Sequence, residues 1–304
     1  MQSHQRKPRF APRVETLESR SCPSVTAVQS GDTLRVTGTG NDILQVVATG
    51  DESYRVQSGT PIANTGGHGY HLSGTPQSFS GVECVMIQLG PGRNYLNLNL
   101  GAVPERGQAM VQIYGNGVGE IPGSNVTATN TDRNNITVDL GTGLKDHEHV
   151  RLDVAPGMGT NRFTLGGTLG RPYGGATLND RSDLDLDYGG GGGTDSVTLN
   201  FFNLNKRSRA ELNVNLGGGD DTFRMNLPQT GGGNVGAFDD RALIDLNLDG
   251  GPGNDTARFS AKHQGNQFNA NLQNVESISG FTNYNNQNNN NTHNLPPLPP
   301  RPND

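Results

Sequence analysis

The feature that most constrains this chain is a strict alternation of apolar and polar residues in short segments. In "LDLDY" (184–188) and "LNVNL" (212–216) every second residue is apolar. This period of two is typical of a β-strand that buries one face and exposes the other. A helix would need a period of 3.6 residues, and no long segment of the sequence shows it. The sequence therefore predicts an almost entirely β protein.

One unit recurs along the middle of the chain. It consists of an alternating strand, a glycine-rich turn that ends in Asp, and a second alternating strand. The clearest copies are "LDLDYGGGGGTDSVTLNF" (184–201), "LNVNLGGGDDTFRMNL" (212–227) and "LIDLNLDGGPGNDTARF" (243–259). Looser copies occur at 34–47, 85–100, 136–154 and 154–165. Such repetition indicates a fold made by stacking similar units.

The residue that ends each turn gives the spacing of these units. Aligned copies place there Asp42, Asn94, Asn161, Asp195, Asp221 and Asp255. The last four follow one another at similar intervals, each of a length that suits one irregular coil. The two earlier intervals, from Asp42 to Asn94 and from Asn94 to Asn161, are much longer. Each of these would need two coils, one of them with a degenerate turn.

The composition favours a thin core. Hydrophobic residues make up 31% of the chain and aromatic residues 6%, and there is no Trp. We therefore expect an irregular parallel β-solenoid, of the β-helix or β-roll kind, in which narrow apolar faces fuse into one core. Outward rows of Asn would bond coil to coil. The alternative is a β-sandwich in which each unit is an antiparallel hairpin.

The glycine–aspartate turns raise the question of calcium. A helix-loop-helix calcium loop starting at Asp245 is excluded, because its twelfth residue would be Thr256 instead of Glu. The nine-residue pattern G-G-x-G-x-D-x-U-x, where U is a large apolar residue, fits 190–198 and, with Ala257 as a small U, 250–258. On these residues the body of the chain resembles the RTX (haemolysin-type) calcium-binding repeats.

That resemblance implies Ca²⁺ held by turn carbonyls and Asp oxygens. The candidate ligands are Asp195, Asp221 and Asp255, followed by Asp220 and Asp42. The repeats of that family run in tandem, whereas each copy here is solitary. The alternative is a tight turn in which Gly permits the backbone path and Asp caps it.

Two further groups are candidate cation sites. The outward row of Asp183, Asp185 and Asp187 places like charges on one strand face, which a cation would relieve. His147 and His149 in "KDHEHV" share the spacing of a two-histidine metal patch, without an identifiable third ligand. A solvated surface is the simpler interpretation of both groups.

The two ends differ from the body. Residues 1–24 form a basic arm, expected to be disordered, in which Leu17, Glu18, Arg20, Pro23 and Ser24 resemble an N-terminal segment of exported or surface proteins of planctomycete bacteria. That resemblance implies an extracellular or cell-surface location. Residues 25–282 are the predicted β-repeat domain. Residues 283–304 are Asn- and Pro-rich and are expected to be a disordered tail.

Hydropathy, cysteine count, net charge and motifs exclude several classes of protein. No apolar run is long enough to span a membrane, two cysteines are too few for a disulfide framework, and a net charge of −6 gives no attraction to nucleic acid. No catalytic motif is present, so we expect a non-enzymatic structural, adhesive or matrix protein. Its expected partners are cell-envelope or extracellular matrix components, including polysaccharide. The alternative is a polysaccharide-acting parallel β-helix enzyme, a lyase or hydrolase.

Overall fold

A computed structural model gives the fold of the chain. It describes residues 25–61, 70–102, 107–115, 132–141, 143–145, 147–166, 175–205, 207–227, 242–260 and 268–280. The predicted N-terminal arm and C-terminal tail lie outside the described residues. The described part contains β-strands and turns and no helix, so the all-β prediction is confirmed. Accordingly, no described helix could cross a membrane.

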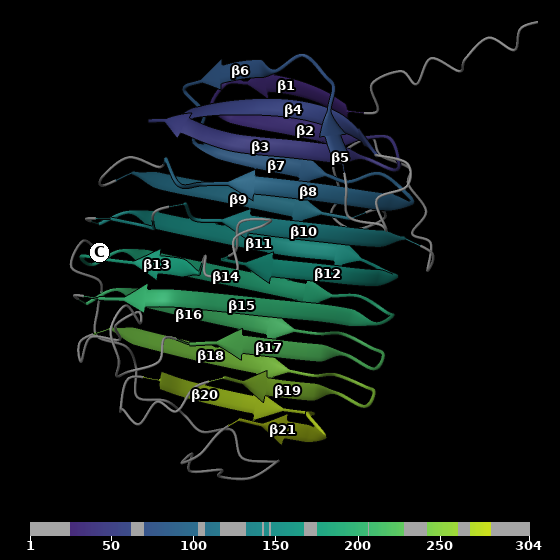
Figure 1. Cartoon of the computed structure of the whole chain (residues 1–304), viewed down its shortest axis with the longest axis vertical. Coiled ribbons are helices and arrows are strands. Elements are labelled where there is room, and N and C mark those ends of the chain that lie inside the picture. Colours follow the sequence, from purple (N-terminus) through teal and green to yellow (C-terminus); the bar gives the residue numbers. More distant parts are fainter. Residues whose placement is uncertain are drawn as a thin grey trace, which may run out of the picture.

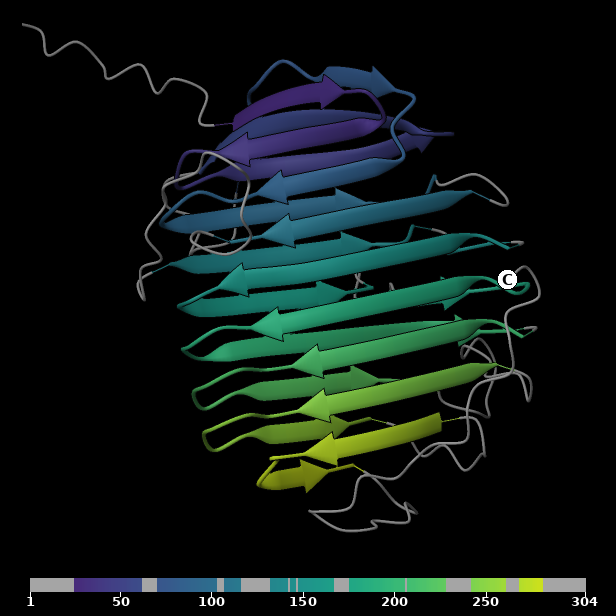
Figure 2. The same ribbon diagram turned by 180° about the vertical axis from the view of Figure 1, so that it is seen from behind.

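The strands form two sheets that lie one behind the other (Figures 1 and 2). The nine-stranded sheet contains, in spatial order, β1 (Val25–Ser30), β2 (Thr33–Gly38), β7 (Cys84–Gln88), β9 (Gln108–Tyr114), β11 (His149–Gly157), β14 (Asp183–Gly190), β16 (Arg209–Asn215), β18 (Leu243–Asp249) and β20 (Phe268–Gln273).

The twelve-stranded sheet contains β21 (Ser277–Ser279), β19 (Thr256–Phe259), β17 (Thr222–Asn226), β15 (Asp195–Leu204), β12 (Thr160–Leu165), β10 (Arg133–Asp139), β8 (Arg93–Asn99), β3 (Ile43–Gly50), β4 (Ser53–Pro61) and β5 (Tyr70–Leu72). Two short strands lie off this path: β13 (Ala176–Leu178) pairs with β15, and β6 (Gln77–Ser80) pairs with β4.

From β7 onward the chain passes from one sheet to the other at almost every turn. In each of the three clearest repeats, the strand before the turn belongs to the nine-stranded sheet and the strand after it to the twelve-stranded sheet. Neighbours within each sheet are parallel, as in the pairing of β14 with β16 and of β15 with β17. Described antiparallel pairs, which the sandwich alternative requires throughout, join only the strands β1 to β6.

The core lies between the two sheets and is formed by the alternating apolar residues. Identical positions of successive strands stack in register, as Leu186, Leu212 and Leu246 do. All three side chains are at most 1% exposed. The facing sheet contributes Phe163 and Phe223, which are fully buried. The predicted thin core is therefore one continuous cluster made from single rows of side chains.

The two long intervals between repeat turns have different explanations. Within the interval from Asn94 to Asn161, β10 supplies an extra strand between β8 and β12, so this interval holds two coils as predicted. The interval from Asp42 to Asn94 does not, because β3 pairs directly with β8. The prediction of two coils there was wrong. The additional residues instead form β4, β5 and β6, which cover the outer edge of β3 in antiparallel pairing.

Candidate functional site

A buried column of polar side chains runs along the turns where strands of the twelve-stranded sheet begin. Its members are Asp42, Asn94, Asn134, Asn161, Asp195, Asp221 and Asp255, each at most 2% exposed. Six of them are the turn-ending residues identified in the sequence. Asn134 was missed, because its turn lacks the paired glycines of the motif. Strand pairing places it directly between Asn94 and Asn161.

A coil is, from here on, one strand of the nine-stranded sheet, the turn after it and the following strand of the twelve-stranded sheet. In the first half of the column, amide groups link one coil to the next. The Nδ2 of Asn94 donates to Oδ1 of Asn134 at 2.8 Å. The Nδ2 of Asn134 donates to Oδ1 of Asn161 at 3.0 Å, and that of Asn161 to Oδ1 of Asp195 at 2.9 Å. An amide is both donor and acceptor, so a row of Asn can form a continuous hydrogen-bonded chain. The expected coil-to-coil bonding by Asn is therefore present, here inside the molecule.

In the second half of the column, each carboxylate accepts a backbone hydrogen bond from the preceding coil. The N–H of Asp195 donates to Oδ1 of Asp221 at 2.6 Å, and the N–H of Asp221 to Oδ1 of Asp255 at 2.8 Å. The N–H of Asp255 donates to Oε2 of Glu276 at 2.6 Å. Glu276, which is exposed, continues the column at its end. No sequence signal pointed to it because no glycine-rich turn precedes it.

The glycines of the motif occupy positions at which a side chain would clash with neighbouring atoms. A Cβ on Gly190, the first glycine, would overlap the carbonyl oxygen of Leu216 in the next coil, and it would also lie 2.6 Å from Oδ2 of Asp195 in its own turn. The glycine two residues before Asp stacks on the preceding coil. At Gly219, with φ of 135°, a Cβ would overlap the carbonyl oxygen of Gly193, and at Gly253 it would overlap that of Gly219. The pattern G-G-x-G-x-D is thus explained by tight stacking of the coils.

Burial raises the pKa of the three aspartates in the second half of the column. Desolvation raises the pKa of Asp195 to about 6, against hydrogen bonds that favour the charged form. Desolvation and, to a smaller extent, the charges of Asp195 and Asp255 raise the pKa of Asp221 to about 6. The pKa of Asp255 is raised mainly by the same burial. Among the described residues, Oδ2 of Asp221 and Oδ2 of Asp255 have no hydrogen-bond partner, which accords with a preference for protonation.

The five predicted calcium ligands do not converge on one point. Oxygens of Asp42 accept the N–H groups of Thr39, Gly40 and Gly90. Asp220 lies on the surface, where Oδ1 accepts the N–H of Asn254 at 3.0 Å. Within the described part of the chain, no three Asp, Glu, His or Cys side chains are grouped to hold a metal ion. A calcium ion at these turns would depend on backbone carbonyl and water oxygens.

Two of the three acids in the outward row contact side chains of the neighbouring strand β11. Oδ2 of Asp185 lies 2.9 Å from Nε2 of His149, and Oδ2 of Asp187 lies 3.5 Å from a guanidinium nitrogen of Arg151. His147 precedes β11 in a turn and contacts Arg181 instead. The two histidines therefore have different partners and do not form a patch.

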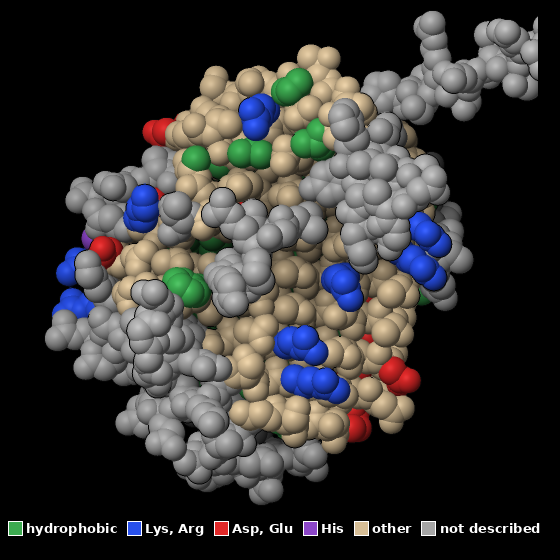
Figure 3. Space-filling model, viewed as in Figure 1, with side chains coloured by type: hydrophobic (Ala, Val, Ile, Leu, Met, Phe, Trp, Pro, Cys, Tyr) green, Lys and Arg blue, Asp and Glu red, His purple; other side chains and the backbone are tan. Residues whose placement is uncertain are grey.

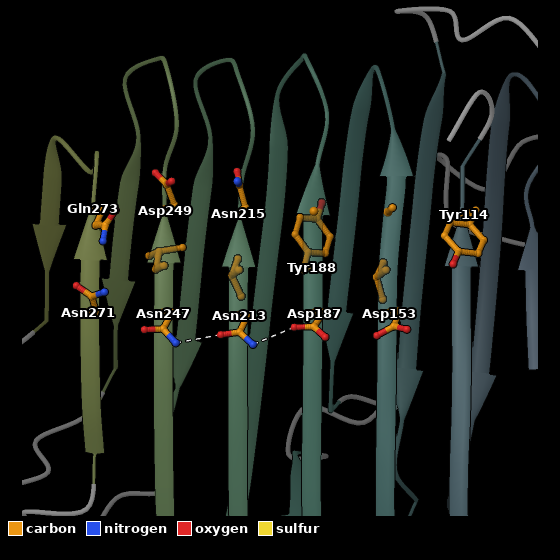
Figure 4. A pocket seen from close by; sticks show the side chains of 15 residues that line it. Tyr114, Asp153, Asp187, Tyr188, Asn213, Asn215, Asn247, Asp249, Asn271 and Gln273 are labelled. Carbon is orange, nitrogen blue, oxygen red and sulfur yellow. Dashed lines mark hydrogen bonds between the residues drawn. The ribbon is translucent and has the colours of Figure 1, made fainter. Parts of the chain in front are cut away.

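The outer face of the nine-stranded sheet contains a groove of about 580 Å³. Figure 4 shows its polar side chains aligned across successive strands. The central row is held by hydrogen bonds from Nδ2 of Asn247 to Oδ1 of Asn213 at 3.0 Å and from Nδ2 of Asn213 to Oδ1 of Asp187 at 2.9 Å. Tyr114 lies at one end of the groove (Figure 4). The arrangement can offer hydrogen-bond donors and acceptors to a long polar ligand.

Comparisons with protein-family models, with curated proteins and with solved structures found no match. The resemblances to RTX repeats and to planctomycete export segments therefore stay predictions from the sequence. Any function has to be argued from the geometry of the column and of the two outer faces.

Proposed function

We propose that this chain is a two-sheet β-solenoid with a structural, adhesive or matrix role, exported or held at the cell surface. The observation that carries the proposal is the buried column, which links consecutive coils from Asp42 to Glu276 by hydrogen bonds. Hydrogen-bonded networks of buried polar groups make a fold rigid and specific. Within the described column, Oδ2 of Asp221 and Oδ2 of Asp255 are the side-chain oxygens without a partner. A rigid stack suits a protein whose surfaces, rather than a catalytic centre, perform its function.

The solenoid part of the proposal rests on the strand order. From β7 onward, consecutive strands alternate between the two sheets at almost every turn, and neighbours within each sheet pair in parallel. The adhesive part rests on the outer faces, where rows of Asn, Asp and Thr repeat at the spacing of the strands. Such flat polar surfaces suit extended partners, so we propose cell-envelope or extracellular matrix components, polysaccharide among them, as the ligands.

The alternative, a polysaccharide-cleaving β-helix enzyme, lacks a supporting observation. The described lining of the groove includes the carboxylates of Asp153, Asp187 and Asp249, but no Arg or Lys. Asp153 accepts hydrogen bonds from Gln112 and Arg151, and Asp187 accepts one from Asn213. These carboxylates are engaged by protein groups, which favours an organising role over acid–base catalysis.

Calcium at Asp195, Asp221 and Asp255 is the alternative to turns that are capped by hydrogen bonds alone. Within the described part of the chain, the side-chain oxygens open to it are the unpartnered Oδ2 atoms of Asp221 and Asp255. If an ion bound only the folded chain, it would stiffen the stack by mass action.

Cell fractionation tests the proposal. Antibodies against the purified chain should detect it in the envelope or medium of the producing cells, and a chain without residues 1–24 should remain in the cytosol. The purified chain should sediment with isolated envelope material and release no reducing sugar ends from it. A cytosolic full-length chain, or released sugar ends, would contradict the proposal.

A further inference from the structure

The described outer face of the twelve-stranded sheet carries arginines with almost no acidic residue among them. The outward positions of β8, β10, β12, β15, β17 and β19 include five arginines, all exposed: Arg93, Arg133, Arg162, Arg224 and Arg258. The only carboxylate at these described positions is Asp139, at the far end of β10, where it accepts the N–H of Gly141. Figure 3 shows basic side chains gathered on this face and acidic ones at its margin.

Four of these arginines form two directly opposed pairs. Arg93 lies opposite Arg133 on neighbouring strands, and Arg224 lies opposite Arg258. Like charges in this position repel each other. Within the described residues no ion pair or side-chain hydrogen bond engages any of the five guanidinium groups. The positive charge is therefore available to an external anion.

The opposite face has the reverse character. Outward positions of the nine-stranded sheet include Asp153, Asp183, Asp185, Asp187, Glu211, Asp245 and Asp249. Some of these acids are already paired with His149, Arg151 and Arg209. The net charge of −6 of the whole chain thus conceals one basic surface.

The arginines follow a diagonal across the sheet. The register puts Arg162 two residues further along its strand than the Arg93–Arg133 pair, and the Arg224–Arg258 pair two residues further again. Between them the outward residues of β15 are Ser196 and Thr198. With strands about 4.8 Å apart, five charges are spread over roughly 25 Å. Their mean spacing is thus about one charge per strand.

We propose that this basic face binds a polyuronate, a linear polysaccharide with one carboxylate on each sugar. The inference rests on the proposed adhesive role and names its ligand. A guanidinium group binds one carboxylate in bidentate fashion, and one sugar ring of an extended chain has about the length of one strand spacing. Hydroxyl groups of Ser196 and Thr198 can bond the uncharged sugar hydroxyls between the arginine pairs. Double-stranded DNA packs its phosphate charges several times more densely along its axis and matches this spacing less well.

The test is calorimetric titration of the full chain with polyuronate oligomers long enough to cross six strands, in chelator, at low and at high NaCl concentration. We expect saturable binding that weakens at high salt. R224Q/R258Q should weaken binding by at least about tenfold, a loss expected for charge-assisted hydrogen bonds. The control is Arg35→Gln, since Arg35 is also exposed but lies on β2 of the other sheet. The affinity of this variant should stay within about twofold of that of the unaltered chain.

Several results would overturn the inference. These are the absence of binding at low salt, equal binding by R224Q/R258Q, and stronger binding of a sulfated dextran or single-stranded DNA of equal length. Self-association in light scattering that R224Q/R258Q abolishes would assign the face to a second copy instead. Circular dichroism melts of each variant keep loss of binding separate from loss of fold. Because envelope location is measured independently, a failed titration with a surface-located chain would refute the ligand and leave the structural role standing.

Discussion

The backbone N–H of Asp195 donates a hydrogen bond to Oδ1 of Asp221, with an N···O distance of 2.6 Å. The two residues belong to successive coils and are each 1% exposed. The acidic side chain of one coil thereby fixes the first residue of a strand in the preceding coil. Removing the side chain would leave a buried N–H without an acceptor.

Asp221→Ala should therefore lower the free energy of unfolding by about 1–3 kcal/mol. Chemical denaturation at about pH 5 is the suitable measurement, because a carboxyl with a pKa of about 6 is then mostly protonated and its charge does not obscure the lost hydrogen bond. The matched control is the adjacent, exposed Asp220, whose replacement by Ala should cost less than about 0.5 kcal/mol. Equal effects of the two substitutions would show that the column does not stabilise the stack.

The raised pKa values predict an unusual dependence of stability on pH. Asp195 and Asp221 have folded-state pKa values of about 6, above the reference value of 3.8. Between these values the folded state binds protons that the unfolded state has lost. The contribution to stability is then greatest at low pH and is lost as the pH rises through 6. From about pH 5 to pH 7 the free energy of unfolding should fall by about 1 kcal/mol for each carboxyl.

Asp221→Asn separates this effect from the rest of the titration. An amide keeps an Oδ1 acceptor for the N–H of Asp195, and Oδ1 of Asn94 already accepts the backbone N–H of Asp42 in the same way. The variant should lose about half of the stability difference between pH 5 and pH 7. A melting midpoint that rises with pH in the unaltered chain would contradict the assignment of buried, protonated carboxyls.

The stacked glycines provide a second test of the turns. Gly219→Ala should destabilise the chain by about 2 kcal/mol or more, because its φ is 135° and the new methyl group would overlap the carbonyl oxygen of Gly193. The neighbouring Gly218 is the control, since a Cβ there would have its nearest contact, Pro252 O, at 3.9 Å. Gly218→Ala should leave the unfolding midpoint almost unchanged. Similar midpoints for both variants would mean that the coils do not stack through Gly219.

Much of the fold could be predicted because its determinants are local. The period of two in "LDLDY" and "LNVNL" identified strands β14 and β16, and the glycine-rich turns identified where one strand ends and the next begins. The antiparallel β4–β6 segment could not be predicted, because its residues alternate like any other strand. Only the direct pairing of β3 with β8 reveals that they lie at the edge instead of forming a coil.

The site was predictable in part for a related reason. Six column residues were identified from turn spacing, whereas Asn134 required knowledge of the register between β10 and its neighbours. The arginine pairs were not predicted either. Arg224 and Arg258 are far apart in the sequence. Only the register of the parallel pair β17–β19 puts them side by side. Long-range register depends on every coil length at once, and the sequence motif does not encode it.

Thermal melts with and without calcium distinguish the two interpretations of the turns, a calcium site and a turn capped by hydrogen bonds alone. A calcium site would raise the melting midpoint in millimolar calcium relative to chelator, since an ion that binds only the folded state stabilises it. Turns capped by hydrogen bonds alone would melt at the same temperature in both. The carboxylates of Asp42, Asp195, Asp221 and Asp255 already accept backbone N–H groups or amide hydrogens, so we expect equal midpoints. A rise that disappears when Asp195, Asp221 and Asp255 are replaced by Asn would instead establish the turns as calcium sites, because Asn keeps an acceptor oxygen but removes the charge.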